Sequence, residues 1–95
     1  MSKLVSLGEI VYTIMCFYGV EDVDTTEAPA VAKQFIAHAS IEYGFPRKET
    51  AAILGCTTQY ISQLANVVTR SIAANDPSYT RDIDLIYDAI DDGND

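Results

Sequence analysis

Apolar side chains recur every three to four residues along most of the chain, and the two-residue alternation typical of strands is absent. Five stretches show this helical spacing, and their ends coincide with capping residues, prolines and glycines. The spacing predicts helices over roughly residues 6–18, 29–43, 46–54, 57–72 and 76–90. We therefore expect an all-α fold, a compact domain of five packed helices.

Local signals mark the starts of several of these helices. Ser6 and Glu9 have the spacing of a capping box, which satisfies free backbone N–H groups in a first turn. Thr57 is the candidate N-cap of the fourth helix, and Asp76-Pro77 opens the fifth. The final residues, 91–95, read Asp-Asp-Gly-Asn-Asp, so we expect one domain over residues 1–90 followed by an acidic frayed tail.

The segment 47–66, RKETAAILGCTTQYISQLAN, fits the template of a helix-turn-helix. Ala51 occupies the position that must be small because the second helix crosses over it. Gly55 occupies the tight turn, where glycine adopts a positive φ at no steric cost. Ile61 and Leu64 occupy the apolar positions that hold the second helix against the core. An ordinary helix–glycine–helix hairpin is the alternative interpretation of the same spacing.

In the helix-turn-helix interpretation, the fourth helix is the recognition helix, and its outward face is polar and rich in amides and hydroxyls. Amide side chains pair with adenine edges, and hydroxyl side chains contact most bases. The candidate base contacts are Thr57, Thr58, Gln59, Tyr60, Ser62, Gln63 and Asn66. The candidate contacts to the DNA backbone are Lys33, Arg47, Lys48 and Arg70. Plain solvated surface is the alternative interpretation of the glutamines.

Charge is distributed unevenly along a chain whose net charge is −8. Residues 1–32 carry −4 and residues 71–95 carry −6, whereas residues 33–70 carry four basic and two acidic side chains, a balance of +2. The overall acidity excludes a protein that coats nucleic acid by bulk electrostatics. Any contact with an anion is therefore expected in the central third, which contains the predicted helix-turn-helix.

The order of elements from about Ile10 to Ile90 resembles the C-terminal DNA-binding domain of the bacterial replication initiator DnaA, a fold of the Trp-repressor type. The resemblance rests on Phe17-Tyr18-Gly19-Val20 at the end of the first helix and on Lys33-Gln34 before the second apolar stripe. It also rests on the helix-turn-helix and on the Asn75-Asp76-Pro77 turn into the last helix. The resemblance implies the fold and binding to double-stranded DNA.

This chain departs from that family at the residues that read DNA. Cys56, Thr57 and Thr58 stand where the family has Arg, Asp and His, and Gln59 and Tyr60 stand where it has hydroxyl residues. The family's basic loop between the first two helices is replaced by the short acidic segment 21–27. The resemblance therefore implies the fold without recognition of the family's own DNA box.

Other chemistry finds little support in the sequence. We see no nucleophile–base pair and no phosphate-binding glycine loop, so we expect neither an enzyme nor a small-molecule substrate or cofactor. One His and two Cys do not suffice for a His/Cys zinc site, and His38 is interpreted as structural or surface-exposed. The apolar stretch 5–20 contains Glu9 and is too short to span a membrane, so the chain is expected to be cytoplasmic, with reduced thiols.

Two functions remain open at this stage. The first is a small DNA-binding protein in transcriptional or replication control, acting as a homodimer or with a protein partner because its basic residues are few. The second is a protein-interaction module of the same fold that has lost DNA binding, whose acidic surface docks on a basic partner or mimics DNA. The amide-rich face of the fourth helix favours the first, and the missing basic loop favours the second.

Overall fold

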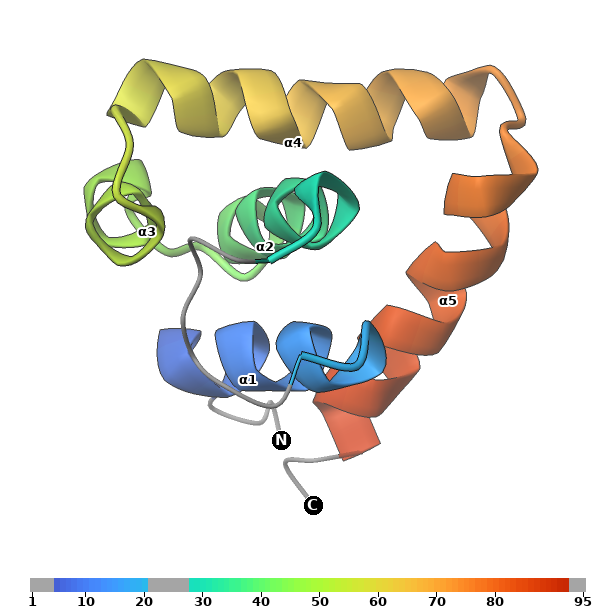
Figure 1. Ribbon diagram of the computed structural model, residues 1–95, viewed down its shortest axis with the longest axis horizontal. Coiled ribbons are helices and arrows are strands. Elements are labelled where there is room, and N and C mark those ends of the chain that lie inside the picture. Colours follow the sequence, from blue (N-terminus) through green and yellow to red (C-terminus); the bar gives the residue numbers. More distant parts are fainter. Residues whose placement is uncertain (1–4, 21–27, 93–95) are drawn as a thin grey trace.

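The structure is a computed structural model that describes residues 5–20 and 28–92 of the chain. Its elements are α1 (Leu7–Phe17), α2 (Ala30–Glu42), α3 (Arg47–Leu54), α4 (Thr58–Ala73) and α5 (Pro77–Asp92). No strand occurs in these described residues, which confirms the expected five-helix, all-α architecture. In Figure 1, α4 and α1 lie on opposite sides of α2, and α5 runs from the end of α4 towards α1.

The starts of α1, α4 and α5 are capped by the side chains that the sequence indicated, whereas Pro29 and Pro46 precede α2 and α3 without a side-chain cap. The Ser6 hydroxyl accepts a hydrogen bond from the N–H of Glu9 at 3.1 Å, and the Thr57 hydroxyl accepts one from the N–H of Tyr60 at 3.1 Å. Asp76 accepts a bond from the N–H of Ser78 at 3.0 Å before the first turn of α5. Each of these bonds satisfies a donor that the helix itself leaves free.

The central helix, α2, is buried on several sides because α1, α3 and α4 all pack against it. Its buried residues are mostly small, which lets neighbouring helices approach closely, and Phe35 and Ile36 supply the bulk. The apolar faces of α1 and α4 complete the core from either side of α2. Ile10 and Ile14 come from α1, and Ile61 comes from α4. The hydrophobic core therefore lies around α2.

The last helix, α5, is held partly by polar side chains. Two of its residues, Ile86 and Ile90, are buried in the core. Side-chain hydrogen bonds tie its length to α2 and to the residues that end α1 and α2. They join Tyr18 to Asp82 at 3.2 Å, Tyr79 to Gln34 at 2.6 Å, His38 with Tyr87 at 2.5 Å, and Tyr43 to Asp91 at 2.7 Å.

The end of α5 differs from the sequence prediction. The stripe predicted a helix to Ile90 and a frayed tail from Asp91, whereas α5 continues to Asp92. The hydrogen bond from Tyr43 to the Asp91 carboxylate contributes to this extension, because it attaches the last turn to the end of α2. The rest of the predicted tail, residues 93–95, and the acidic segment 21–27 lie outside the described residues.

Candidate nucleic-acid interface

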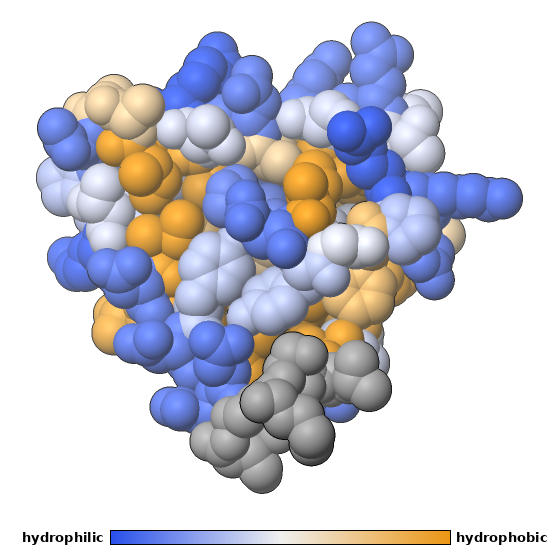
Figure 2. Space-filling view, turned by 180° about the vertical axis from the view of Figure 1, so that it is seen from behind, coloured by the Kyte–Doolittle hydropathy of each residue, from blue (hydrophilic) through white to orange (hydrophobic). Residues whose placement is uncertain are grey.

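The two faces of α4 have opposite character. Its inner face buries Ile61, Leu64, Ala65 and Val68. Opposite them lies a stripe of exposed polar side chains at spacings of four, three and four residues, which places them in one row along the helix. We call this row the α4 ridge; it consists of Gln59, Gln63, Asn66 and Arg70. In Figure 2, the side chains that project along the top of the molecule, where α4 runs, are mostly hydrophilic.

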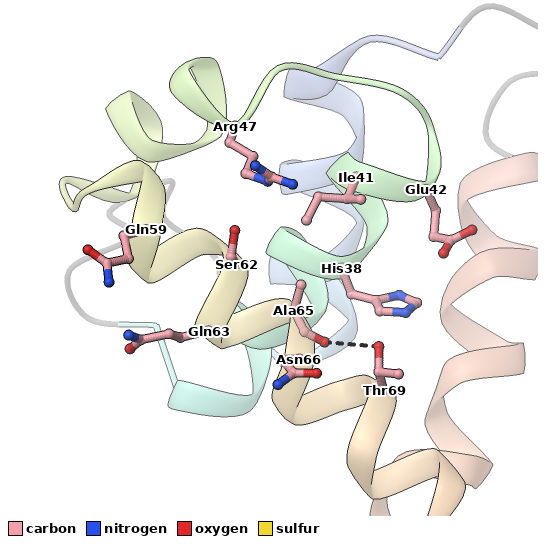
Figure 3. Close-up of a pocket in the computed structure, with 10 residues that line it drawn as sticks. All are labelled: His38, Ile41, Glu42, Arg47, Gln59, Ser62, Gln63, Ala65, Asn66 and Thr69. Atoms are coloured by element: carbon pink, nitrogen blue, oxygen red, sulfur yellow. Dashed lines mark hydrogen bonds between the residues drawn. The ribbon is translucent and has the colours of Figure 1, made fainter.

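A groove runs along each side of the α4 ridge. The first, of about 490 Å³, lies towards α2 and α3, and its lining includes His38, Glu42, Arg47 and Ser62. The second, of about 320 Å³, is lined on its far side by Gln34 and Tyr60. Gln63 and Asn66 line both grooves, so their amides stand between them. In Figure 3, Gln59 and Gln63 point away from the helices beneath α4.

The turn between α3 and α4 has the features that the sequence indicated. Gly55 has a φ of 69°, in the left-handed region that glycine enters freely. The N–H of Cys56 bonds to the carbonyl of Ala51 at 3.0 Å and closes the end of α3. Ala51, Ile61 and Leu64 are all buried. This geometry brings the start of α4 directly after a short helix that packs against it.

The start of α3 supplies the positive charge of this surface. Arg47 and Lys48 are exposed in its first turn, and no side chain caps that turn. Arg47 reaches into the first groove beside Ile41, as Figure 3 shows, and both basic residues line a shallow hollow of about 520 Å³ with Thr58. Glu49 lies in the same turn and offsets one of the two positive charges, so the helix dipole and a net side-chain charge of +1 act together there to favour an anion.

The remaining predicted contacts fall at different places. Thr57 and Thr58 are exposed at the start of α4, and Ser62 is half-buried on the wall of the first groove. Tyr60 is 47% exposed and lies on the opposite flank of α4. Lys33 is half-buried on α2 and close enough to lower the pKa of the Cys56 thiol, which burial raises more strongly. It therefore lies near the turn, and it does not line the hollow of Arg47 and Lys48.

Three polar residues of the first groove were not predicted as site residues. His38 and Glu42 on α2 and Thr69 on α4 line the first groove. Burial lowers the pKa of His38, an effect that the Glu42 carboxylate partly opposes, and the ring is held by Tyr87 of α5. No local pattern identifies the two residues of α2, because their place beside α4 depends on how α4 crosses α2.

Neither a membrane span nor a metal centre is found in residues 5–20 and 28–92. No helix there is long and apolar enough to cross a bilayer. No group of three His, Cys, Asp or Glu side chains in these segments is arranged to hold a metal ion.

Comparison of the chain with protein-family models, with curated proteins and with solved structures found no match. The resemblance to the DNA-binding domain of DnaA therefore stays a prediction drawn from the residues named above.

Proposed function

We propose that the protein is a small DNA-binding protein in which α3 and α4 form a helix-turn-helix. The observation that carries this proposal is the α4 ridge, with three exposed amides in a row on a helix whose opposite face is buried. Amides are the side chains that pair with base edges in the major groove. A role in transcriptional or replication control agrees with this chemistry and with the resemblance stated above.

In this proposal α4 enters the major groove and the first turn of α3 meets the phosphate backbone. Arg47 and Lys48 contact phosphates on one side of the groove, and Arg70 contacts them where α4 leaves it. Four basic residues in the central third neutralise only a few phosphates, so the electrostatic contribution to affinity is modest. We therefore expect a homodimer or a partner protein to complete a strong site.

A titration of labelled random-sequence duplex DNA at about 50 mM and about 200 mM salt tests the proposal. We expect saturable binding that weakens with salt, and a double variant Arg47→Gln/Lys48→Gln should flatten the salt slope by about 2. Arg81→Gln is the matched control, because Arg81 lies on α5 with its side chain 74% exposed. Absence of binding at the lower salt concentration, or equal slopes for all three proteins, contradicts the proposal.

The second candidate function is a protein-interaction module, and the observation that favours it is the outer face of α5. Asp84, Asp88 and Asp92 are exposed there beside Leu85, which is 52% exposed. A partner for this face carries Lys and Arg side chains around an apolar contact. If the chain binds a lysine-rich peptide but no DNA, and if Asp84→Asn/Asp88→Asn/Asp92→Asn abolishes that binding, this second function replaces the first.

A further inference from the structure

The α4 ridge differs from most DNA-reading surfaces in the kind of hydrogen bonds it offers. Each amide of Gln59, Gln63 and Asn66 provides both donors and an acceptor. Adenine presents an acceptor, N7, and a donor, N6, in the major groove, so one amide pairs with both. Guanine presents two acceptors, N7 and O6, which are best matched by Arg or Lys. The ridge therefore complements adenine better than guanine.

The three amides are also free to make these bonds. Within the described parts of the chain, no side chain or carbonyl holds the amides of Gln59, Gln63 or Asn66 in a hydrogen bond. Gln34, the fourth amide beside α4, is different, because its carbonyl oxygen accepts a bond from Tyr79 at 2.6 Å. The fold thus engages the Gln34 amide in a hydrogen bond between α2 and α5 and leaves the ridge amides available to bind a ligand.

The spacing of the ridge sets how many base pairs it covers. Gln59 and Asn66 are seven residues apart, which is about 10.5 Å along a helix. Base pairs stack at about 3.4 Å, so this length corresponds to about three steps, which join about four base pairs. Arg70 lies a further turn along the same row, where α4 approaches its end. The ridge carries no cationic side chain before Arg70.

The flanks of the ridge suit thymine, the partner of adenine. Thymine presents a methyl group and an acceptor oxygen in the major groove, and threonine methyls contact that methyl group. Thr58 is exposed at the start of α4, and Thr69 lines the first groove further along. The Thr69 hydroxyl donates to the carbonyl of Ala65 at 3.4 Å, so Thr69 offers its methyl group, whereas Thr58 offers both methyl and hydroxyl on the same side of the ridge.

We propose that α4 selects double-stranded DNA containing a run of about four A·T pairs, with the three ridge amides pairing with three of its adenines. This inference rests on the proposed DNA-binding function and adds the base composition of its target. It assigns the discrimination to the major-groove edge of adenine, at N7 and N6, and leaves the phosphate contacts to Arg47 and Lys48.

The experiment is enrichment of bound duplexes from a random library with the full chain, followed by titration of matched probes. We expect enrichment of A·T runs, and replacing one A·T pair by G·C should weaken binding about 5- to 150-fold. Replacing adenine by 7-deazaadenine, which lacks the N7 acceptor, should weaken binding similarly. Gln63→Arg should shift the preference at one position towards guanine. Arg81→Gln, which adds an amide on α5, should leave the preference unchanged.

Each other outcome identifies what has failed. Salt-dependent binding without base preference, or enrichment of G·C runs, overturns the A·T inference while the DNA-binding function stands. A·T enrichment that tolerates 7-deazaadenine also overturns it, because the bases are then read elsewhere than at N7. Absence of DNA binding overturns both. The variants change exposed side chains of α4 and α5, and circular dichroism checks that their helix content is unchanged.

Discussion

Gly55 shows how a single backbone conformation sets the direction of the candidate recognition helix. Its φ of 69° lies where an L side chain enters only at a cost, and no atom lies within 4 Å of the place that a Cβ would occupy. Packing therefore permits a side chain at this position, and only the backbone opposes it. Gly8 is the contrasting case, since it lies within α1, where glycine is a poor helix former.

We predict opposite effects for the same substitution at these two glycines. Gly55→Ala should lower the free energy of unfolding by about 1–2 kcal/mol, because it forces alanine into the left-handed region. Gly8→Ala should raise it by about 0.5–1 kcal/mol, because alanine is a better helix former than glycine. The new Cβ fits without a clash, since its nearest atom is the Ser6 hydroxyl oxygen at 4.0 Å. Urea denaturation measures both. An unchanged midpoint for Gly55→Ala contradicts the positive φ.

His38 makes stability depend on pH, because burial lowers the pKa of the chain's single histidine. The unfolded chain then takes up a proton at a higher pH than the folded chain does, so stability falls as the pH drops through about 6.5. We predict that Tm decreases between about pH 7.5 and about pH 5.5, above the range where most carboxylates titrate.

The variant His38→Asn should make Tm nearly independent of pH over that interval. Tyr87→Phe is the control, because it removes the hydrogen bond to the ring but keeps the histidine, whose pKa shift is caused chiefly by burial. Thermal unfolding followed by circular dichroism measures all three proteins. A wild-type Tm that rises as the pH drops reverses the sign and contradicts the assigned pKa direction.

Among the helices, what the sequence could predict depended on the distance between partners along the chain. The starts of α1 and α4 followed from Ser6 and Thr57, because each capping bond spans three residues. The attachment of α5 did not, because Tyr18 and Asp82 are 64 positions apart and His38 and Tyr87 are 49 apart. Such pairs follow from the crossing of helices, which no local pattern encodes.

The candidate site likewise has features that the sequence could predict and features that it could not. The α4 ridge could be predicted, because its spacing lies within one helix and the buried stripe fixes which face is outward. The grooves beside it could not, since Gln34 and Glu42 reach them from α2. Lys33 was predicted as a contact to the DNA backbone, and its place on α2 near the turn could not be predicted, because it follows from the packing of α2 against α3 and α4.

The packing of α4 against the core predicts that truncating Leu64 lowers the stability of the protein much more than truncating its neighbour Gln63. Leu64 is 6% exposed, so Leu64→Ala should lower the free energy of unfolding by about 2–5 kcal/mol through lost burial and a new cavity. Gln63→Ala, one position away on the ridge, should change it by less than about 0.5 kcal/mol. Equal urea midpoints for the two variants contradict the assigned faces of α4.

Across the whole molecule, the acidic end is separated from the α4 ridge. Figure 1 shows α5 leaving the end of α4 and running to the opposite side, where its last turns lie beside α1. The molecule measures 32 × 27 × 27 Å, whereas exposed charges are screened beyond about 8 Å at physiological salt. Carboxylates in the last turns of α5 therefore act weakly on a ligand bound at α4, despite a net charge of −8.

We predict that the position of a carboxylate decides its effect on DNA binding more than the net charge does. The variant Asp84→Asn/Asp88→Asn/Asp92→Asn should change affinity by less than about twofold at physiological salt, with a somewhat larger gain at low salt. Asp91 is left unchanged because it bonds to Tyr43. Gln63→Glu, which adds one carboxylate to the ridge, should weaken binding at least about tenfold through like-charge repulsion.

Titration of one duplex probe against both variants and the wild-type chain measures the contrast. If removing three charges from α5 strengthens binding as much as Gln63→Glu weakens it, net charge governs binding and α4 is not the contact surface. If neutralising α5 abolishes binding while the helix content is unchanged, the acidic face takes part in the complex. Only a strong effect at Gln63 beside a weak one at α5 agrees with DNA lying along the α4 ridge.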